Sequence, residues 1–154
     1  GNFHFIALDS THFGYRWHED FEPPYTDFHD GASIPGFPDD EDIASIKRRY
    51  HNAVAWVDFQ VEEFVLELKK QGRYDNSVIV VTGDHGEEFF ECGFWGHTSN
   101  FSPPQVQVPF IFRGPGIEPG SEPRPTSHLD FSSTLLELLG VAQPAEMTGR
   151  SLLG

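Results

Sequence analysis

Residues 78–97 read VIVVTGDHGEEFFECGFWGH, and this stretch decides the fold. Its first five residues are all β-branched, which is typical of a buried strand in an α/β sheet. Asp84 and His85 follow between two glycines, and a second histidine, His97, closes the stretch. A turn requires no carboxylate–imidazole pair, so the pattern indicates a functional site at the end of the strand.

The segments around this strand predict an α/β fold. Apolar residues spaced by three and four, between the acidic run at 39–42 and Gly72, are typical of one long amphipathic helix. An irregular excursion rich in Pro, Gly and aromatic residues precedes that helix, from Thr11 to Pro38. The order strand, helix, strand, strand, helix predicts a largely parallel sheet flanked by helices, in one domain over residues 1–154. The predicted strands are 3–8, 77–82 and 108–112, and the final helix is 132–139.

The composition and net charge of the chain restrict the kinds of ligand that it can bind. The chain has 154 residues, 38% of them hydrophobic, with a net charge of −14 and a pI near 4.7. An acidic surface repels phosphate backbones, so we expect no nucleic-acid binding. An anionic ligand would need local cations or a bound metal. The sequence has no apolar run of about 18 residues, so no transmembrane helix is predicted. Its single cysteine, Cys92, can form no intrachain disulfide.

Asp84 and His85 are candidate metal ligands. In open α/β sheets, ligands bind beyond the carboxyl ends of the strands, where this pair lies. Carboxylate oxygen and imidazole nitrogen together suit Zn²⁺ or Mn²⁺. A structural reading stays open, in which Asp84 caps the next segment and His85 is buried and hydrogen-bonded, because two ligands alone do not form a metal site.

Two further histidines are candidates for the same pocket. His97 lies in an aromatic cluster, and His12 lies in THFGY just past the first predicted strand. If the strands are parallel neighbours, both loops converge on one edge of the sheet. Each could instead be a buried histidine with a purely structural hydrogen bond. Glu87 and Glu88 could support metal ligands, but a solvated acidic loop is the favoured reading.

The motifs together resemble a known family. VIVVTGDHGEE, followed by GH, QVQVPFIF and GPG, resembles the C-terminal half of the sulfatase-like branch of the alkaline phosphatase superfamily. YHNAVAWVD is similar to the helix before the metal-ligand strand, and HLDFSSTLLELLG with GRSLL is similar to the closing segment. DSTHFGY and GFWGHTSNFS most resemble membrane-anchored sulfatase-like proteins of the bacterial envelope, whose relatives include phosphoethanolamine and phosphoglycerol transferases.

This resemblance assigns roles to four residues. Asp84 and His85 match the metal-ligand pair, His97 matches a histidine that contacts substrate or a second metal, and His12 matches a histidine of an upstream loop facing the same pocket. The implied cofactor is a divalent metal, with Zn²⁺ or Mn²⁺ favoured and Ca²⁺ possible. The implied substrate is a sulfate or phosphate ester, on a lipid or a glycan among others, attacked by a Thr, Ser or formylglycine nucleophile.

The resemblance also predicts what lies outside this chain. The nucleophile and the first acidic ligand would precede residue 1, and Cys92 lacks the CxPxR context of a formylglycine site. We therefore expect a C-terminal part of a catalytic domain, inactive without its N-terminal remainder. Membrane attachment would come only from a missing N-terminal anchor, and the location would be periplasmic or extracytoplasmic. The alternatives are a binding or regulatory module that has lost catalysis and a stand-alone metal-binding domain.

Overall fold

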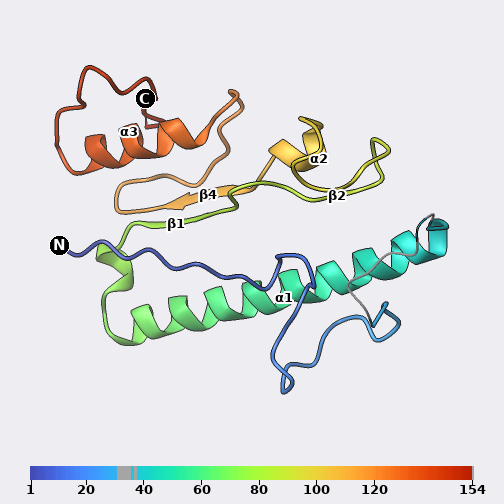
Figure 1. The fold of residues 1–154 in the computed structure, drawn as a ribbon. Helices are drawn as coiled ribbons and strands as arrows, with labels where there is room; N and C mark the ends of the chain where they lie inside the picture. Colours follow the sequence, from blue (N-terminus) through green and yellow to red (C-terminus); the bar gives the residue numbers. More distant parts are fainter. Residues whose placement is uncertain (31–35, 37, 154) are drawn as a thin grey trace. The chain divides into compact units, whose positions relative to one another are not determined.

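The computed structural model describes residues 1–30, 36 and 38–153, so the part of the predicted excursion at 31–35 and 37 lies outside the described residues. The chain forms two compact units, residues 1–113 and 114–154. Helices and strands alternate along it, as expected of an α/β protein (Figure 1). The first unit holds α1 (Asp40–Lys70), a short 3₁₀ helix (Tyr74–Asn76), β1 (Ile79–Thr82), β2 (Glu88–Phe89), β3 (Trp95–Gly96), α2 (Pro103–Val106) and β4 (Phe110–Arg113), and the second holds α3 (His128–Leu138).

The predicted long helix is confirmed as α1. Its N-terminus is closed by a capping box, because the Asp39 carboxylate accepts hydrogen bonds from the backbone N–H groups of Glu41 and Asp42, both at 2.9 Å. Asp42 in turn accepts from the Asp39 N–H at 3.2 Å. Gly72 follows the helix with φ +65°, a left-handed conformation that suits glycine after a helix C-terminus.

Strand pairing differs from the predicted parallel arrangement. β1 pairs with β4 in antiparallel register, with Ile79 opposite Arg113 and Thr82 opposite Phe110. The intervening chain forms the antiparallel β2–β3 hairpin and the short helix α2. A parallel pair needs a crossover that carries the chain back to the opposite end of the sheet. Here the connection returns at the same end, so β4 runs against β1.

The strand predicted at residues 3–8 is not formed within the described residues. Its aromatic side chains are largely exposed, at 71% for Phe3 and 84% for Phe5. A strand requires a hydrogen-bonded neighbour, and the described part of the chain places none beside this segment. The prediction of a buried strand at residues 3–8 was therefore wrong.

An aromatic cluster forms the core of the first unit. The fully buried apolar residues are Tyr15, Ile46, Ala53 and Phe89. The ring of Tyr15 meets that of Tyr50 on α1 edge to face, with centroids 5.4 Å apart, and lies 5.9 Å from Phe89 of β2. Phe89 in turn contacts Trp95 of β3 at 5.4 Å. The core thus joins the loop after the N-terminal segment, the long helix and the hairpin.

The N-terminal segment runs alongside α1 (Figure 1). Polar side chains of the helix hold it there. Asn52 is fully buried, and its amide group accepts from the Tyr25 N–H at 3.0 Å and donates to the Tyr25 carbonyl at 2.9 Å. Arg49 donates to the carbonyl oxygens of Gly14 at 3.0 Å and His29 at 3.1 Å. These bonds satisfy backbone groups that the irregular loop cannot pair with itself.

In the second unit, α3 begins at residue 128, before the predicted start at 132. The earlier start follows from Asp130, whose buried carboxylate accepts from the backbone N–H of Ser127 at 2.8 Å. The same carboxylate accepts from the backbone N–H of Arg150 at 3.0 Å. Asp130 therefore caps the helix and ties the C-terminal segment to it.

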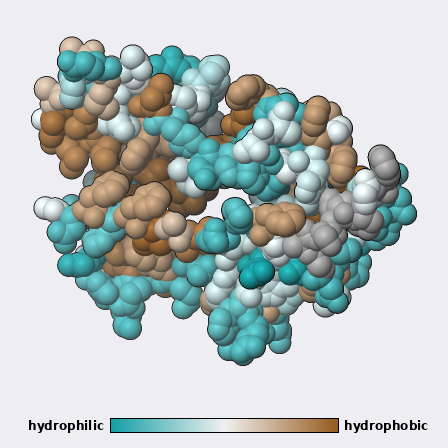
Figure 2. Space-filling view, viewed as in Figure 1, coloured by the Kyte–Doolittle hydropathy of each residue, from teal (hydrophilic) through white to brown (hydrophobic). Residues whose placement is uncertain are grey.

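Hydrophobic side chains reach the surface at several places (brown in Figure 2), with Phe101 91% and Ile111 59% exposed. Among the described residues, no helix combines the length and apolar character needed to cross a membrane.

Candidate metal and histidine site

The structure brings three of the predicted site histidines together. The rings of His85 and His97 are stacked, with centroids 3.9 Å apart and planes inclined by 27°. The ring of His12 meets that of His97 edge to face, with centroids 6.4 Å apart. The loops after the N-terminal segment and after β1 therefore meet at one place.

The aromatic core, rather than a pair of parallel strands, produces this meeting. His12 lies three residues before Tyr15, and His97 lies two residues after Trp95. Tyr15 and Trp95 both contact Phe89 of β2. Because the anchoring residues are packed on one ring, the two histidines are held close to each other.

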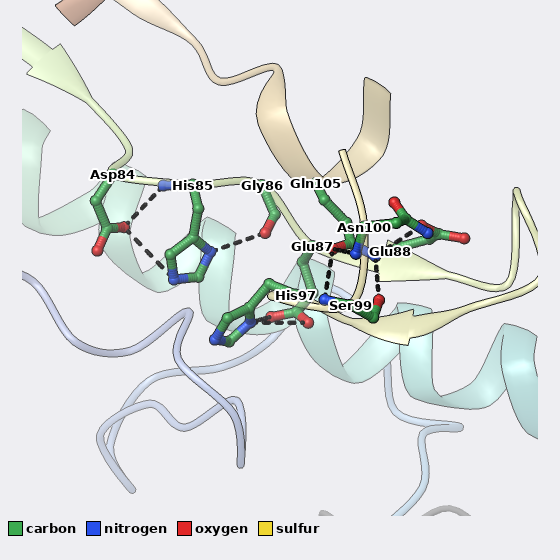
Figure 3. A network of polar contacts seen from close by, with 9 residues as sticks. All are labelled: Asp84, His85, Gly86, Glu87, Glu88, His97, Ser99, Asn100 and Gln105. Carbon is green, nitrogen blue, oxygen red and sulfur yellow. Dashed lines mark hydrogen bonds and ion pairs between the residues drawn. The ribbon is translucent and has the colours of Figure 1, made fainter. Parts of the chain in front are cut away.

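His85 presents one ring nitrogen toward Asp84 (Figure 3). Its Nδ1 lies 2.9 Å from the carbonyl oxygen of Gly86, which can only accept a hydrogen bond. In the neutral ring Nδ1 therefore carries the proton, and the lone pair is on Nε2, 3.8 Å from Asp84 Oδ1. Ring nitrogens that bind metals are commonly oriented by such a bond from the opposite nitrogen.

Asp84 and His85 fit part of a metal site. Metal–ligand bonds of about 2.0–2.2 Å allow two ligand atoms on one ion to lie up to about 4 Å apart, which accommodates the observed separation. The Asp84 side chain is 92% exposed, and its hydrogen bond within the described residues is with the His85 backbone N–H at 3.0 Å. Across residues 1–30, 36 and 38–153, no three His, Cys, Asp or Glu side chains are grouped to hold a metal ion. Asp84 and His85 could provide two ligands, and a complete site needs more.

His97 has a different environment. Its Nδ1 lies 3.3 Å and 3.4 Å from the two carboxylate oxygens of Glu87, whose side chain is only 6% exposed. Because the rings of His97 and His85 are stacked nearly parallel, their nitrogen lone pairs do not converge on one point. The geometry makes His97 an oriented imidazole beside the Asp84–His85 pair.

The negative charge of Glu87 affects the pKa of two tyrosines in the core. Burial, and after it the proximity of Glu87, raises the pKa of the Tyr15 phenol far above its ordinary value. The same two causes raise the pKa of Tyr50. The Glu87 carboxylate therefore lies near the aromatic core as well as beside His97.

The prediction that Glu87 and Glu88 form a solvated acidic loop was wrong, because the Glu87 side chain is only 6% exposed and Glu88 is buried. The Glu88 side chain is fully buried. It accepts hydrogen bonds from Ser102 Oγ at 2.5 Å, Gln105 Nε2 at 2.9 Å, and the backbone N–H groups of Cys92 at 2.9 Å and Phe94 at 3.0 Å (Figure 3 shows Gln105). Burial alone would raise the pKa of Glu88, but these donors outweigh it and lower the pKa to about 2.

Gly86 is required because the backbone packs closely against α2 at this position. A Cβ at this position would lie 2.0 Å from the carbonyl oxygen of Pro104 in α2. The Gly86 N–H donates to the Gln105 carbonyl at 2.8 Å. The backbone after His85 therefore packs directly against α2. This contact fixes the position of the backbone from which the His85 side chain extends.

Comparison with known proteins identifies the family of this chain. The model of the Sulfatase family matches residues 2–141. The chain belongs to the sulfatase family. Its similarity to solved structures of this family places it in the alkaline-phosphatase-like α/β fold.

Several members are similar in sequence or structure. A choline-sulfatase of Rhizobium meliloti is 33% identical over 103 residues, covering 67% of this chain and 20% of the relative. The structure of a phosphonate monoester hydrolase from Silicibacter pomeroyi is 32% identical with a TM-score of 0.70, over 75% of this chain and 23% of that one. A protein solved in complex with its substrate D-glucosamine-2-N,6-O-disulfate is 30% identical with a TM-score of 0.61, over 73% and 23%. The chain spans about a fifth of the length of the choline-sulfatase it matches.

Proposed function

We propose that this chain supplies part of the active site of a metal-dependent sulfatase-family hydrolase acting on sulfate or phosphate esters. The observation that carries the proposal is the Asp84–His85 pair, in which a carboxylate oxygen and an unprotonated ring nitrogen face each other at 3.8 Å. Two hydrogen-bond acceptors gain nothing from this approach by themselves. A cation between them would make it favourable.

Asp84 Oδ1 and His85 Nε2 would hold the metal, with Zn²⁺ or Mn²⁺ favoured by this donor set and Ca²⁺ also possible. Further ligands would come from parts of the longer protein. When bound, the ion would supply positive charge to an anionic ester and lower the pKa of an attacking hydroxyl. A chain with a net charge of −14 needs such a local reversal of field to bind an anion.

His97 would contact the substrate rather than the same metal. Glu87 holds its Nδ1, which leaves Nε2 as the ring nitrogen that would face the substrate and accept a proton or a hydrogen bond from it. His12, edge to face against His97, would act on the same pocket.

The relatives indicate the range of substrates. Their names include choline-sulfatase and phosphonate monoester hydrolase, and one was solved with a disulfated glucosamine. We propose ester cleavage or phosphoryl transfer through a covalent nucleophile outside residues 1–154, so that this chain alone is inactive. We also propose an extracytoplasmic location and membrane attachment through another part of the protein, on the resemblance of THFGY and GFWGH to envelope proteins.

Calorimetric titration of Zn²⁺ and Mn²⁺ into the metal-free chain tests the proposal. We expect saturable 1:1 binding that Asp84→Ala abolishes and that His97→Ala leaves within about threefold of the parent affinity, because the stacked ring is not a ligand. Asp58→Ala is the matched control, since Asp58 is also exposed but lies on α1. Binding that survives Asp84→Ala, or that Asp58→Ala weakens equally, would reject the assignment of Asp84 and His85.

A further inference from the structure

A surface cavity of about 400 Å³, open to solvent on one side, lies between the turn at residues 18–22 and the middle of α1. It involves none of the residues of the Asp84–His97 site. Its lining consists of His18, Asp20, Phe21, Glu22, Trp56 and Phe59.

Three aromatic rings that pack against one another form the apolar part of this lining. Trp56 and Phe59 lie one helical turn apart on α1. Their rings are stacked, with centroids 5.5 Å apart and planes inclined by 19°. Phe21 is tilted against both, at 5.2 Å and 56° from Trp56 and at 5.9 Å and 43° from Phe59. The faces of these rings carry the negative end of the aromatic quadrupole, which attracts a cation within about 6 Å.

The polar lining has the complementary charge. Asp20 and Glu22 are exposed carboxylates, and no Lys or Arg occurs among the residues described as lining the cavity. The His18 ring is stacked on Trp56, with centroids 6.1 Å apart, and its Nδ1 lies 3.2 Å from the Asp20 backbone N–H and 3.5 Å from the Asp20 carboxylate. A bound cation would thus meet ring faces and carboxylates, and an anion would be repelled.

The turn that completes the cavity is fixed in advance. The Phe21 N–H donates to the His18 carbonyl at 3.0 Å, which closes the turn. Tyr25, just beyond it, is clamped by both atoms of the buried Asn52 amide. A preformed wall costs little ordering entropy on binding.

We propose that this cavity binds an organic cation, a quaternary or alkylated ammonium group that packs on Trp56, Phe21 and Phe59 with its charge balanced by Asp20 and Glu22. Aromatic walls also stack on sugars. The acceptor-only carboxylates and the lack of a basic residue in the lining favour the cation, and a neutral sugar becomes an outcome of the test.

Tetramethylammonium chloride is the probe, with tert-butanol as a neutral compound of similar shape. Proton–nitrogen NMR follows the three indole N–H signals of the full chain, of which Trp17 and Trp95 lie outside the cavity and serve as internal controls. We expect a saturable shift of the Trp56 signal alone, and binding of tert-butanol weaker by about tenfold, as a cation–π contribution requires.

Two kinds of variant then test the contribution of the aromatic rings and that of the carboxylates separately. Phe59→Leu removes one ring and keeps the Trp56 reporter, and we expect binding weaker by about fivefold. Phe64→Leu changes an exposed aromatic residue of the same helix outside the cavity and should leave binding unchanged. The double variant Asp20→Asn/Glu22→Gln should weaken binding by about threefold and reduce its dependence on salt.

The proposal is overturned by equal binding of tert-butanol and tetramethylammonium, by equal effects of Phe59→Leu and Phe64→Leu, or by the absence of a saturable Trp56 shift. A Trp56 shift caused by methyl glucoside and not by tetramethylammonium would assign the cavity to sugars instead. The double variant changes only exposed side chains, so its result does not depend on tolerance of a core substitution.

Discussion

Asp84 and Glu88 are four residues apart and have opposite environments. The Asp84 side chain is 92% exposed and contacts only its neighbour His85 within the described residues. Glu88 is fully buried and accepts four hydrogen bonds. In the hairpin, the Glu88 carboxylate is fully hydrogen-bonded, whereas the Asp84 carboxylate oxygens remain largely available to a ligand. The difference separates the residues that build the site from those that would act in it.

Gly86→Ala should produce the largest effect, because Gly86 is where the Asp84 loop packs against α2. A Cβ 2.0 Å from the Pro104 carbonyl forces α2 and the loop apart. We expect a loss of about 3 kcal/mol in the free energy of unfolding, typical of severe overpacking. Urea denaturation of the parent and the variant measures it.

Gly120→Ala is the control for this substitution. Nothing lies within 4 Å of a Cβ at Gly120, so the change tests the loss of glycine freedom alone. We expect no loss, and a gain of up to about 1 kcal/mol from reduced unfolded-state entropy. If Gly86→Ala is as mild as Gly120→Ala, α2 does not press on the loop and the site is not positioned in this way.

Glu88→Gln should come next in size. Its amide nitrogen would face donors, since Ser102, Gln105 and two backbone N–H groups all point at the carboxylate. We expect a lower melting temperature, with a smaller shift than for Gly86→Ala. Glu91→Gln, which removes a half-exposed ion pair with Lys47, should cost at most about 1 kcal/mol.

The stability contributed by the Glu88 charge should depend on pH in a defined window. The pKa of Glu88 is lowered from 4.5 to about 2 in the folded state. The contribution is therefore fully present above pH 4.5 and is lost as the pH falls toward 2. Melting curves of parent and Glu88→Gln should differ by a constant amount above this window and converge below it. A difference that persists at the lowest pH would show that packing, and not charge, distinguishes the two side chains.

The sequence predicted what depends on local periodicity and on the order of motifs. The long helix, the strand before Asp84 and the sulfatase-like α/β fold all followed from patterns within the chain. The meeting of His12 with His97 was also predicted, although for the wrong reason. Strand direction could not be read because it depends on where a long connection returns. A continuous apolar run is typical of parallel strands, but it does not by itself fix the direction of the neighbouring strand.

The burial of Glu88 was missed because a Glu-Glu pair looks the same in solvent and in a core. What distinguishes Glu88 is the supply of donors from Ser102 and Gln105, which are 14 and 17 residues away in the sequence. One local signal was available. The ECGF segment forms a tight turn with Gly93 at φ +89°, and such a turn leaves backbone N–H groups that require an acceptor.

Asp84→Asn should have the smallest effect on stability and so sharpens the comparison most. An exposed Asn keeps an oxygen to accept the His85 backbone N–H, so the free energy of unfolding should change by no more than about 0.5 kcal/mol. The same substitution removes the charge that a divalent ion needs, and calorimetry should show affinity for Zn²⁺ reduced at least about tenfold. A loss of stability comparable to that of Glu88→Gln would instead make Asp84 a structural cap. Unchanged stability combined with lost metal binding is the result that a residue kept for chemistry must give, because nothing in the fold of this chain then depends on its charge.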